Sequence, residues 1–117
     1  MNEIYNTLVS ISKAYAQDKG FAYVIWADDT FRLAFRHNGN QLAGVWLGIK
    51  PFHNQVDLYA YNNVTDECFS HLHRDFPAAR VVTDDALKLR SDNLIEAKKF
   101  VETVIHYMEL HRQAMHA

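Results

Sequence analysis

The stretch FAYVIWADDTFRLAFRHNGNQLAGVWLGIKPFHNQVDLYAY, residues 21–61, decides the fold, because four alternating segments are separated there by turn signals. Short runs in which apolar and polar residues alternate, rich in aromatic and branched side chains, are typical of strands. Asn38-Gly39 is the strongest hairpin signal in the chain, because both residues tolerate a positive φ. Asp28-Asp29 and the break at Lys50-Pro51 mark the other two turns. The stretch therefore predicts a meander of four antiparallel strands.

One strand register fits all three turns and sorts the side chains into two faces, because alternate residues of a strand point to opposite sides. It pairs Phe31 with Trp26 of the first strand and with Trp46 of the third, and it pairs Ile49 with Gln55. The first face is then wholly apolar, and we expect it to form the core: Ala22, Val24, Trp26, Phe31, Leu33, Phe35, Leu42, Trp46, Val56, Leu58 and Ala60.

The second face mixes arginine and tyrosine with small and branched apolar residues. It carries Tyr23, Ile25, Arg32, Ala34, Arg36, Gln41, Ala43, Val45, Leu47, Ile49, Asp57, Tyr59 and Tyr61. Arginine and tyrosine provide contact area together with polar groups, which is typical of recognition surfaces. Three interpretations are open: an interface for a partner or for self-association, a pocket for a small anionic or aromatic ligand, or a surface covered by the first helix or by residues 79–90. The candidate binding residues are Tyr23, Arg32, Arg36, Asp57, Tyr59 and Tyr61.

Apolar residues at helical spacing predict helices on either side of the meander. The first covers residues 3–18, and a short middle helix begins after Thr65, which is a good N-cap. Two short strands, ARVVT and ALKLR, follow and are joined through Asp84-Asp85. Ser91 or Asn93 then caps a long last helix.

The predicted order of elements is α-β-β-β-β-α-β-β-α. Two amphipathic helices have about the right area to cover one face of a four-stranded sheet. The sequence therefore predicts a single α+β domain over residues 1–117, a two-layer sandwich in which the N- and C-terminal helices pack on a four-stranded antiparallel meander.

Composition bounds the class of protein. The chain has 117 residues, of which 49% are hydrophobic and 22% are charged, which suffices for a real core. The net charge of −2 provides no basic surplus, which argues against nucleic acid as a partner, although it does not exclude a local basic patch. No apolar stretch approaches the roughly 20 residues of a membrane span, and the N-terminus lacks signal-peptide features. We therefore expect a cytoplasmic location and no membrane partner.

The chain carries no catalytic or cofactor motif of real specificity. On the middle helix Glu67, His71 and Asp75 are spaced by four residues, so that they share one face and are the candidates for a metal ion. The same spacing is also common on a solvated helix face. Cys68, the chain's one cysteine, is expected to be a buried thiol rather than a nucleophile. No cofactor is predicted, and an enzymatic role is doubtful.

These observations predict a small non-enzymatic binding module. It would use the arginine and tyrosine face of the sheet to bind a protein partner or a second copy of itself as a homodimer. The alternative is a domain that binds a small molecule or a metal ion, with weak hydrolytic activity centred on the middle helix.

Overall fold

The computed structural model describes residues 2–38, 41–61, 64–83 and 86–115. The helices are α1 (Glu3–Lys19), α2 (Asp66–Asp75) and α3 (Leu94–Met115). The strands are β1 (Ala22–Ile25), β2 (Phe31–Asn38), β3 (Gln41–Phe52), β4 (Gln55–Tyr61), β5 (Arg80–Thr83) and β6 (Ala86–Ser91). The order of elements along the chain and the α+β class are as predicted.

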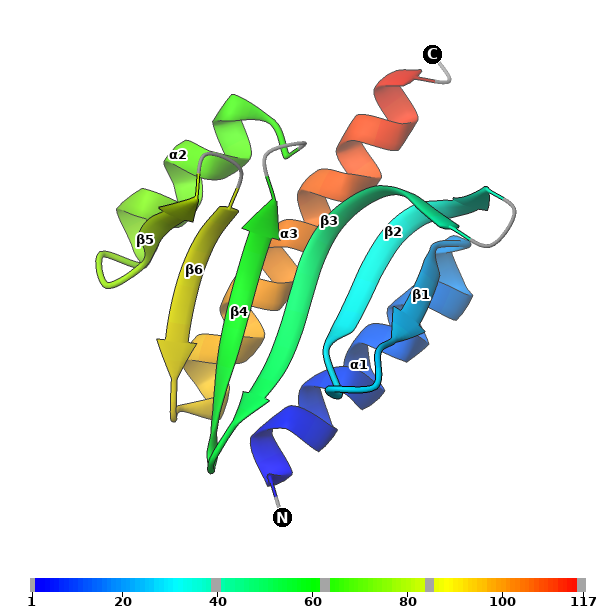
Figure 1. Cartoon of the computed structure of the whole chain (residues 1–117). Coiled ribbons are helices and arrows are strands. Elements are labelled where there is room, and N and C mark those ends of the chain that lie inside the picture. The colour runs from blue at the N-terminus through cyan, green and yellow to red at the C-terminus, as the bar shows by residue number, and fades with distance from the viewer. Residues whose placement is uncertain (1, 39–40, 62–63, 84–85, 116–117) are drawn as a thin grey trace.

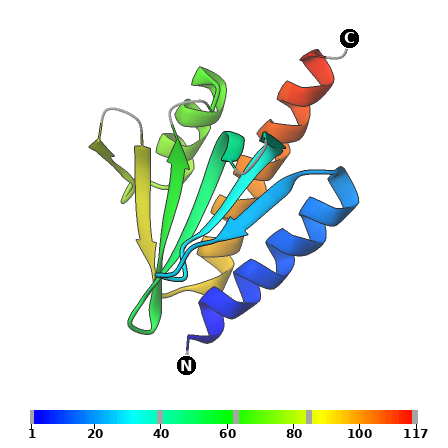
Figure 2. The same ribbon diagram turned by 45° about the vertical axis from the view of Figure 1, so that its right-hand side comes forward.

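The six strands form one antiparallel sheet in the order β1-β2-β3-β4-β6-β5. The prediction of a four-stranded sheet is therefore wrong, because β6 pairs with the free edge of β4 and β5 then pairs with β6. An unpaired edge would leave the polar backbone groups of β4 without partners, and β6 satisfies them. The three helices lie together on one face of this sheet (Figures 1 and 2), so the two-layer arrangement holds.

The predicted caps begin the helices. The side chains of Asn2 and Thr65 accept hydrogen bonds from the backbone N–H groups of the first turns of α1 and α2, and Asn93 does the same for α3. Gly20 ends α1 with a φ of 73°, in the left-handed region that favours glycine.

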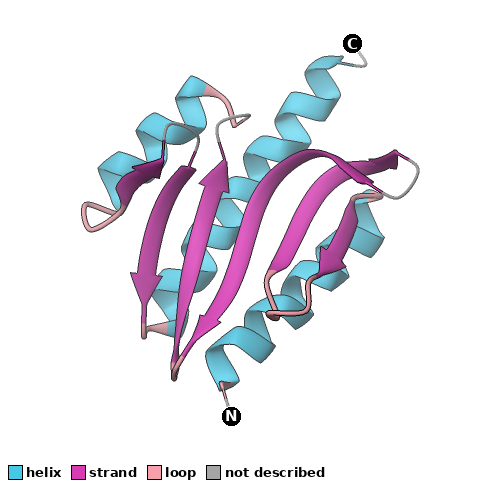
Figure 3. Ribbon diagram, in the orientation of Figure 1, coloured by secondary structure: helices cyan, strands magenta, loops and turns pink. Residues whose placement is uncertain are grey.

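The core lies between the sheet and the helical layer, which Figure 3 shows in two colours. Every helix contributes to it, since each has an apolar stripe that faces the sheet. Its fully buried side chains include Leu8, Phe31, Leu33, Trp46, Leu47, Ile49, Val56, Leu58, Leu72, Leu87, Leu89, Phe100 and Val104.

The predicted pairing of β1 is wrong by one residue. Trp26 and Thr30 close a three-residue loop, in which the Trp26 N–H donates to the Thr30 oxygen and Asp29 takes a φ of 66°. A two-residue turn was expected, and the additional residue turns each side chain of β1 to the opposite face. Tyr23 therefore pairs with Leu33 on the core side, whereas Trp26 is 49% exposed and lies outside the core.

A β-bulge changes the predicted faces of β3. Leu33 pairs with Leu47 and Ala34 with Val45, so that Trp46 is the additional residue and turns inward beside Leu47. As a result Leu47 is fully buried, and so is Ile49, although both were predicted on the second face.

The last turn of the meander comes later than predicted. β3 continues through Lys50 and Pro51, and the chain reverses at residues 53–54, where His53 has a φ of 54°. Lys50 consequently lies opposite Asp57. In the second turn Asn38 pairs with Gln41, while Gly39 lies outside the described residues, as does the predicted turn Asp84-Asp85.

Candidate functional site

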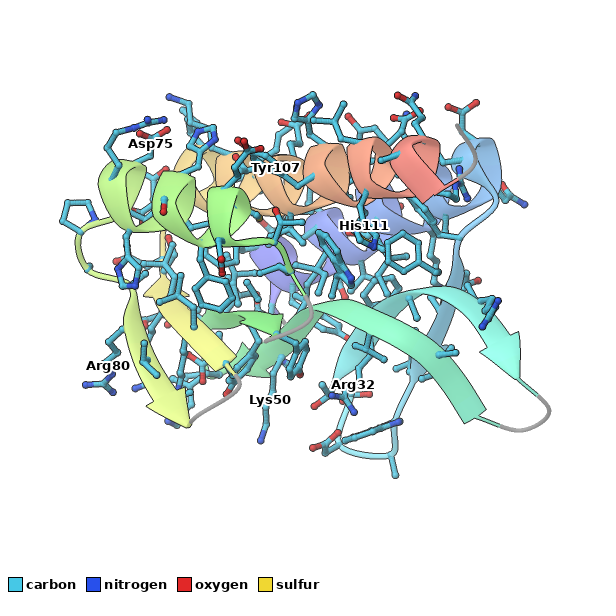
Figure 4. All side chains as sticks on the ribbon, turned by 90° about the horizontal axis from the view of Figure 1, so that it is seen from above. Arg32, Lys50, Asp75, Arg80, Tyr107 and His111 are labelled. Carbon is cyan, nitrogen blue, oxygen red and sulfur yellow. The ribbon has the colours of Figure 1, made fainter. Side chains whose placement is uncertain are left out.

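The sheet face turned away from the helices is the candidate site, and we call it the outer face. Figure 4 shows Arg32, Lys50 and Arg80 on the opposite side of the sheet from the helical layer. Neither α1 nor the described residues 79–83 and 86–90 cover it, because α1 packs on the other face and β5 and β6 extend the sheet sideways (Figure 1). Its charged and aromatic side chains are Trp26, Arg32, Arg36, Lys50, Phe52, Asp57, Tyr59, Tyr61, Arg80, Lys88 and Arg90.

Five of the six candidate binding residues share the outer face. Arg32, Arg36, Asp57, Tyr59 and Tyr61 lie on it, because alternation within each strand was predicted correctly for them. The sixth candidate, the tyrosine of β1, was assigned to this face wrongly. It stacks on a core phenylalanine with ring centroids 5.4 Å apart.

The outer face is strongly basic. It holds six of the chain's 12 lysine and arginine residues, although the net charge of the whole chain is −2. Within the described part of the six strands, Asp57 is the one acidic residue on this side. Asp28 reaches the edge of the face from the β1–β2 loop, with 3.9 Å between its carboxylate and the Lys50 nitrogen. The folded chain therefore separates its charges, with positive groups on the sheet and most acids elsewhere.

A row of side chains crosses the outer face at right angles to the strands. Arg32, Gly48, Tyr59, Lys88 and Arg80 occupy directly paired positions on five neighbouring strands. Because paired residues on neighbouring strands are about 5 Å apart, the row places a cation at each end and an aromatic ring between them.

Stacking between rings, rather than ion pairing, holds Arg32 in place. Its guanidinium carbon lies 4.5 Å from the centroid of the Trp26 ring and 4.7 Å from that of the Tyr61 ring. Gly48 gives the Tyr61 ring its space, because a Cβ at this position would lie 2.7 Å from the Tyr61 hydroxyl oxygen. The Arg32 Nε is buried and finds no hydrogen-bond acceptor among the described residues. Arg32 is thus a positioned cation whose charge no described acid neutralises.

Asp57 organises the other half of the face. Its side chain is 4% exposed and accepts two hydrogen bonds from Arg90, at 2.8 Å from Nε and 3.1 Å from Nη2. The Lys88 nitrogen lies 3.4 Å from the same carboxylate. Burial alone would raise the pKa of Asp57, but the Arg90 hydrogen bonds and the charge of Lys88 outweigh it, so that the pKa lies below its ordinary value. Asp57 is therefore ionised at neutral pH.

Aromatic rings support both cations around Asp57. The Arg90 guanidinium lies 3.6 Å from the centroid of the Phe52 ring, and the Lys88 nitrogen lies 5.7 Å from that of Tyr59. A pocket of ≈ 240 Å³ opens beside them, lined by Ala78, Arg80, Lys88 and Arg90.

A second hollow of ≈ 510 Å³ lies between α2 and α3 on the helical side. His71 connects the two helices there, with its Nδ1 3.2 Å from the Tyr107 hydroxyl and its Nε2 2.8 Å from an Asp75 oxygen. Glu67 does not join them, and the described residues contain no group of three histidine, cysteine or acidic side chains able to hold a metal ion. The candidate ligands Glu67, His71 and Asp75 are therefore not gathered into a group of this kind.

Cys68 lies on the buried side of α2 and is fully buried. Burial raises the pKa of its thiol to about 12, because the charged thiolate would lose its solvation in the core. We expect native Cys68 to react with a thiol reagent such as dithionitrobenzoate at pH 8 only as fast as the protein unfolds. The check is the labelling rate in native buffer and in urea; rapid labelling in native buffer would show that the thiol is accessible.

The chain matches no protein-family model, and comparisons with curated proteins and with solved structures find no significant match. None of the helices in the described part of the chain has the length and apolar character that a bilayer span requires.

The sequence did not point to Lys88, Arg90 or Arg80 as members of the site. The available signal was the alternation in ALKLR, where Leu87 and Leu89 point to one side of the strand and Lys88 and Arg90 point to the other. That signal predicts a strand with a basic side, but only the pairing of β6 with β4 places this side next to Asp57.

Proposed function

We propose that this protein is a non-enzymatic binding module whose outer face binds an acidic protein partner. The observation that carries the proposal is that half of the chain's basic residues lie on one open sheet face, where the one acid among the described strand residues is buried and already paired. Such a surface attracts an acidic partner through complementary charge.

The aromatic residues favour a protein as that partner. Trp26, Tyr59 and Tyr61 lie among the cations, and tryptophan, tyrosine and arginine are the residues enriched at the centres of protein interfaces. Because stacking already holds Arg32 and Arg90 in place, these side chains lose little rotamer freedom on binding.

Self-association through the outer face remains a prediction. Repulsion between the like charges of the two copies makes it less favourable than the binding of an acidic partner. A two-fold dimer buries the same surface of both copies, so that six cations would meet the same six cations. An acidic partner has no such cost. The mass of the chain at micromolar concentration, measured by light scattering, tests the dimer directly.

Charge reversal on the outer face should strongly weaken binding to an acidic polypeptide. We expect the double substitution Arg36→Glu and Lys50→Glu to weaken binding of fluorescein-labelled poly-L-glutamate at least about tenfold, measured by anisotropy at low salt. Arg36 is exposed and the Lys50 side chain is 45% exposed, so the thermal midpoint should change little. Binding by the unaltered protein should also weaken as salt rises, because salt screens exposed charges.

The matched control is Lys98→Glu with Lys99→Glu, which makes the same change of charge at exposed positions of α3. Binding by this control variant should be retained. Equal loss in both double variants would show that only net charge matters and would refute the site. Tighter binding of a single-stranded oligonucleotide than of poly-L-glutamate would contradict the choice of a protein partner.

A further inference from the structure

We propose that the pocket lined by Arg80, Lys88 and Arg90 binds the dianion of a phosphate monoester, presented by a phosphorylated side chain of the partner. This inference rests on the proposed function and specifies its chemistry: the partner is acidic and also phosphorylated where it meets the β5–β6 side of the outer face.

The three cations converge from two neighbouring strands. Arg80 and Lys88 are directly paired across β5 and β6, and Arg90 lies two residues further along β6 on the same side. Neighbouring strands are about 4.8 Å apart and alternate residues of a strand about 7 Å apart, so that one phosphate group can reach all three. The pocket of ≈ 240 Å³ has room for such a group.

Lys88 and Arg90 are already held in position before any ligand binds. Asp57 binds Arg90 through two hydrogen bonds, and Lys88 lies 3.4 Å from the same carboxylate. The rings of Phe52 and Tyr59 lie under them. A site whose side chains are already ordered loses less entropy on binding than a set of free surface lysines.

The charge of the pocket matches a phosphate monoester. Three cations and the one Asp57 carboxylate leave two positive charges, and a phosphorylated side chain carries about −1.5 to −2 at pH 7. A carboxylate would leave one charge unmatched.

Unused hydrogen-bond donors remain for the phosphate oxygens. A guanidinium has about five N–H donors and an ammonium about three, and Asp57 takes only two from Arg90. Among the residues that the structure describes, Arg80 has no hydrogen-bond or ion-pair partner, so its guanidinium is available for bidentate binding.

The competing explanation is that these charges only protect the edge of the sheet from pairing with another chain. Lysine and arginine on an edge strand deter pairing with another chain, and β5 is an edge strand. That role explains Arg80, but it does not require Lys88 and Arg90 on the inner strand to be anchored to a buried carboxylate.

The experiment compares two labelled peptides that differ by one phosphate. Both alternate glycine and glutamate; one has a central serine and the other a central phosphoserine. With the full chain, we expect the phosphopeptide to bind at least about tenfold more tightly, measured by fluorescence anisotropy, because a phosphate gains several charge-assisted hydrogen bonds. Arg80→Gln should remove this preference. Arg80 is exposed on an edge strand, so this variant should fold, which circular dichroism checks.

Two further variants separate the pocket from general electrostatics. Lys98→Gln, an equal loss of charge on α3, should leave both affinities unchanged. Arg36→Gln, on the outer face but away from the pocket, should weaken both peptides equally and keep their ratio. A ratio near one in the unaltered protein, or a ratio that survives Arg80→Gln, overturns the proposal.

Two probes test the source of the phosphate. A peptide with glutamate in place of phosphoserine should bind like the serine peptide; equal binding of glutamate and phosphoserine would identify a carboxylate site instead. Inorganic phosphate should compete only weakly, and competition as strong as that of the phosphopeptide would contradict a partner-borne group. If the peptides bind equally and Arg36→Glu with Lys50→Glu abolishes both, this inference fails and the proposed function stands. If neither peptide binds, both fail.

Discussion

Replacing Trp46 by alanine is expected to lower the free energy of unfolding by about 3–5 kcal/mol, the usual cost of removing a large buried aromatic side chain. Trp46 is 1% exposed and packs edge-to-face on Phe35 with ring centroids 5.4 Å apart. A close-packed interior collapses only partly around a removed side chain, so much of the space left by the indole ring would stay empty. Urea denaturation followed by circular dichroism measures the loss.

The chain's other tryptophan is the matched control. Trp26 is 49% exposed on the outer face and stacks on Arg32, a cation–π contact worth about 0.5–1 kcal/mol at an exposed site. Trp26→Ala should therefore cost no more than about 1 kcal/mol of stability, while weakening binding by the outer face. Similar losses of stability for the two variants would show that both rings belong to one core, as the predicted register has it, and would contradict the β1 pairing.

Replacing Asp57 by asparagine is expected to have the second largest effect, and this effect should depend on pH. The variant leaves Lys88 and Arg90 without their counter-charge. Breaking a fully buried pair costs about 3–5 kcal/mol, and we expect about 2 kcal/mol here because Arg90 is partly exposed.

The sign of the pH dependence follows from the pKa of Asp57, which folding lowers below the ordinary value of 3.8. A carboxyl group of this kind stabilises the folded state above its ordinary pKa, and the stabilisation is lost as the pH falls through the folded pKa. The difference in unfolding free energy between the unaltered protein and Asp57→Asn should thus be full at pH 7 and shrink below about pH 4. Urea titrations at pH 7, 4 and 2.5 measure it.

Asp92→Asn provides the comparison for Asp57→Asn, since Asp92 is exposed. It should change stability little at every pH, as surface substitutions usually do. A difference for Asp57→Asn that stays constant from pH 7 to 2.5 would show that the lost hydrogen bonds, and not the charge, account for the effect.

The register errors have a common physical cause. Hairpin turns were placed by residue type, but Asp29 and His53, which are not glycine, take the positive φ angles that set the observed turns. One additional loop residue turns a whole strand over, and this moved Tyr23 to the core side. The bulge at Trp46 is equally absent from the alternation, because it depends on how β2 pairs with β3.

Local patterns in the sequence by themselves determined the order of helices and strands, the capping residues and the alternation that sets Arg32, Arg36, Asp57, Tyr59 and Tyr61 on one side of their strands. These features depend on a residue and its near neighbours in the chain. Only the tertiary structure decided that β6 pairs with β4, and so that Lys88 and Arg90 meet Asp57 beside the row that starts at Arg32. Strand pairing joins segments that are distant in the chain, so a net charge of −2 can conceal a basic face that exists only once the sheet is formed.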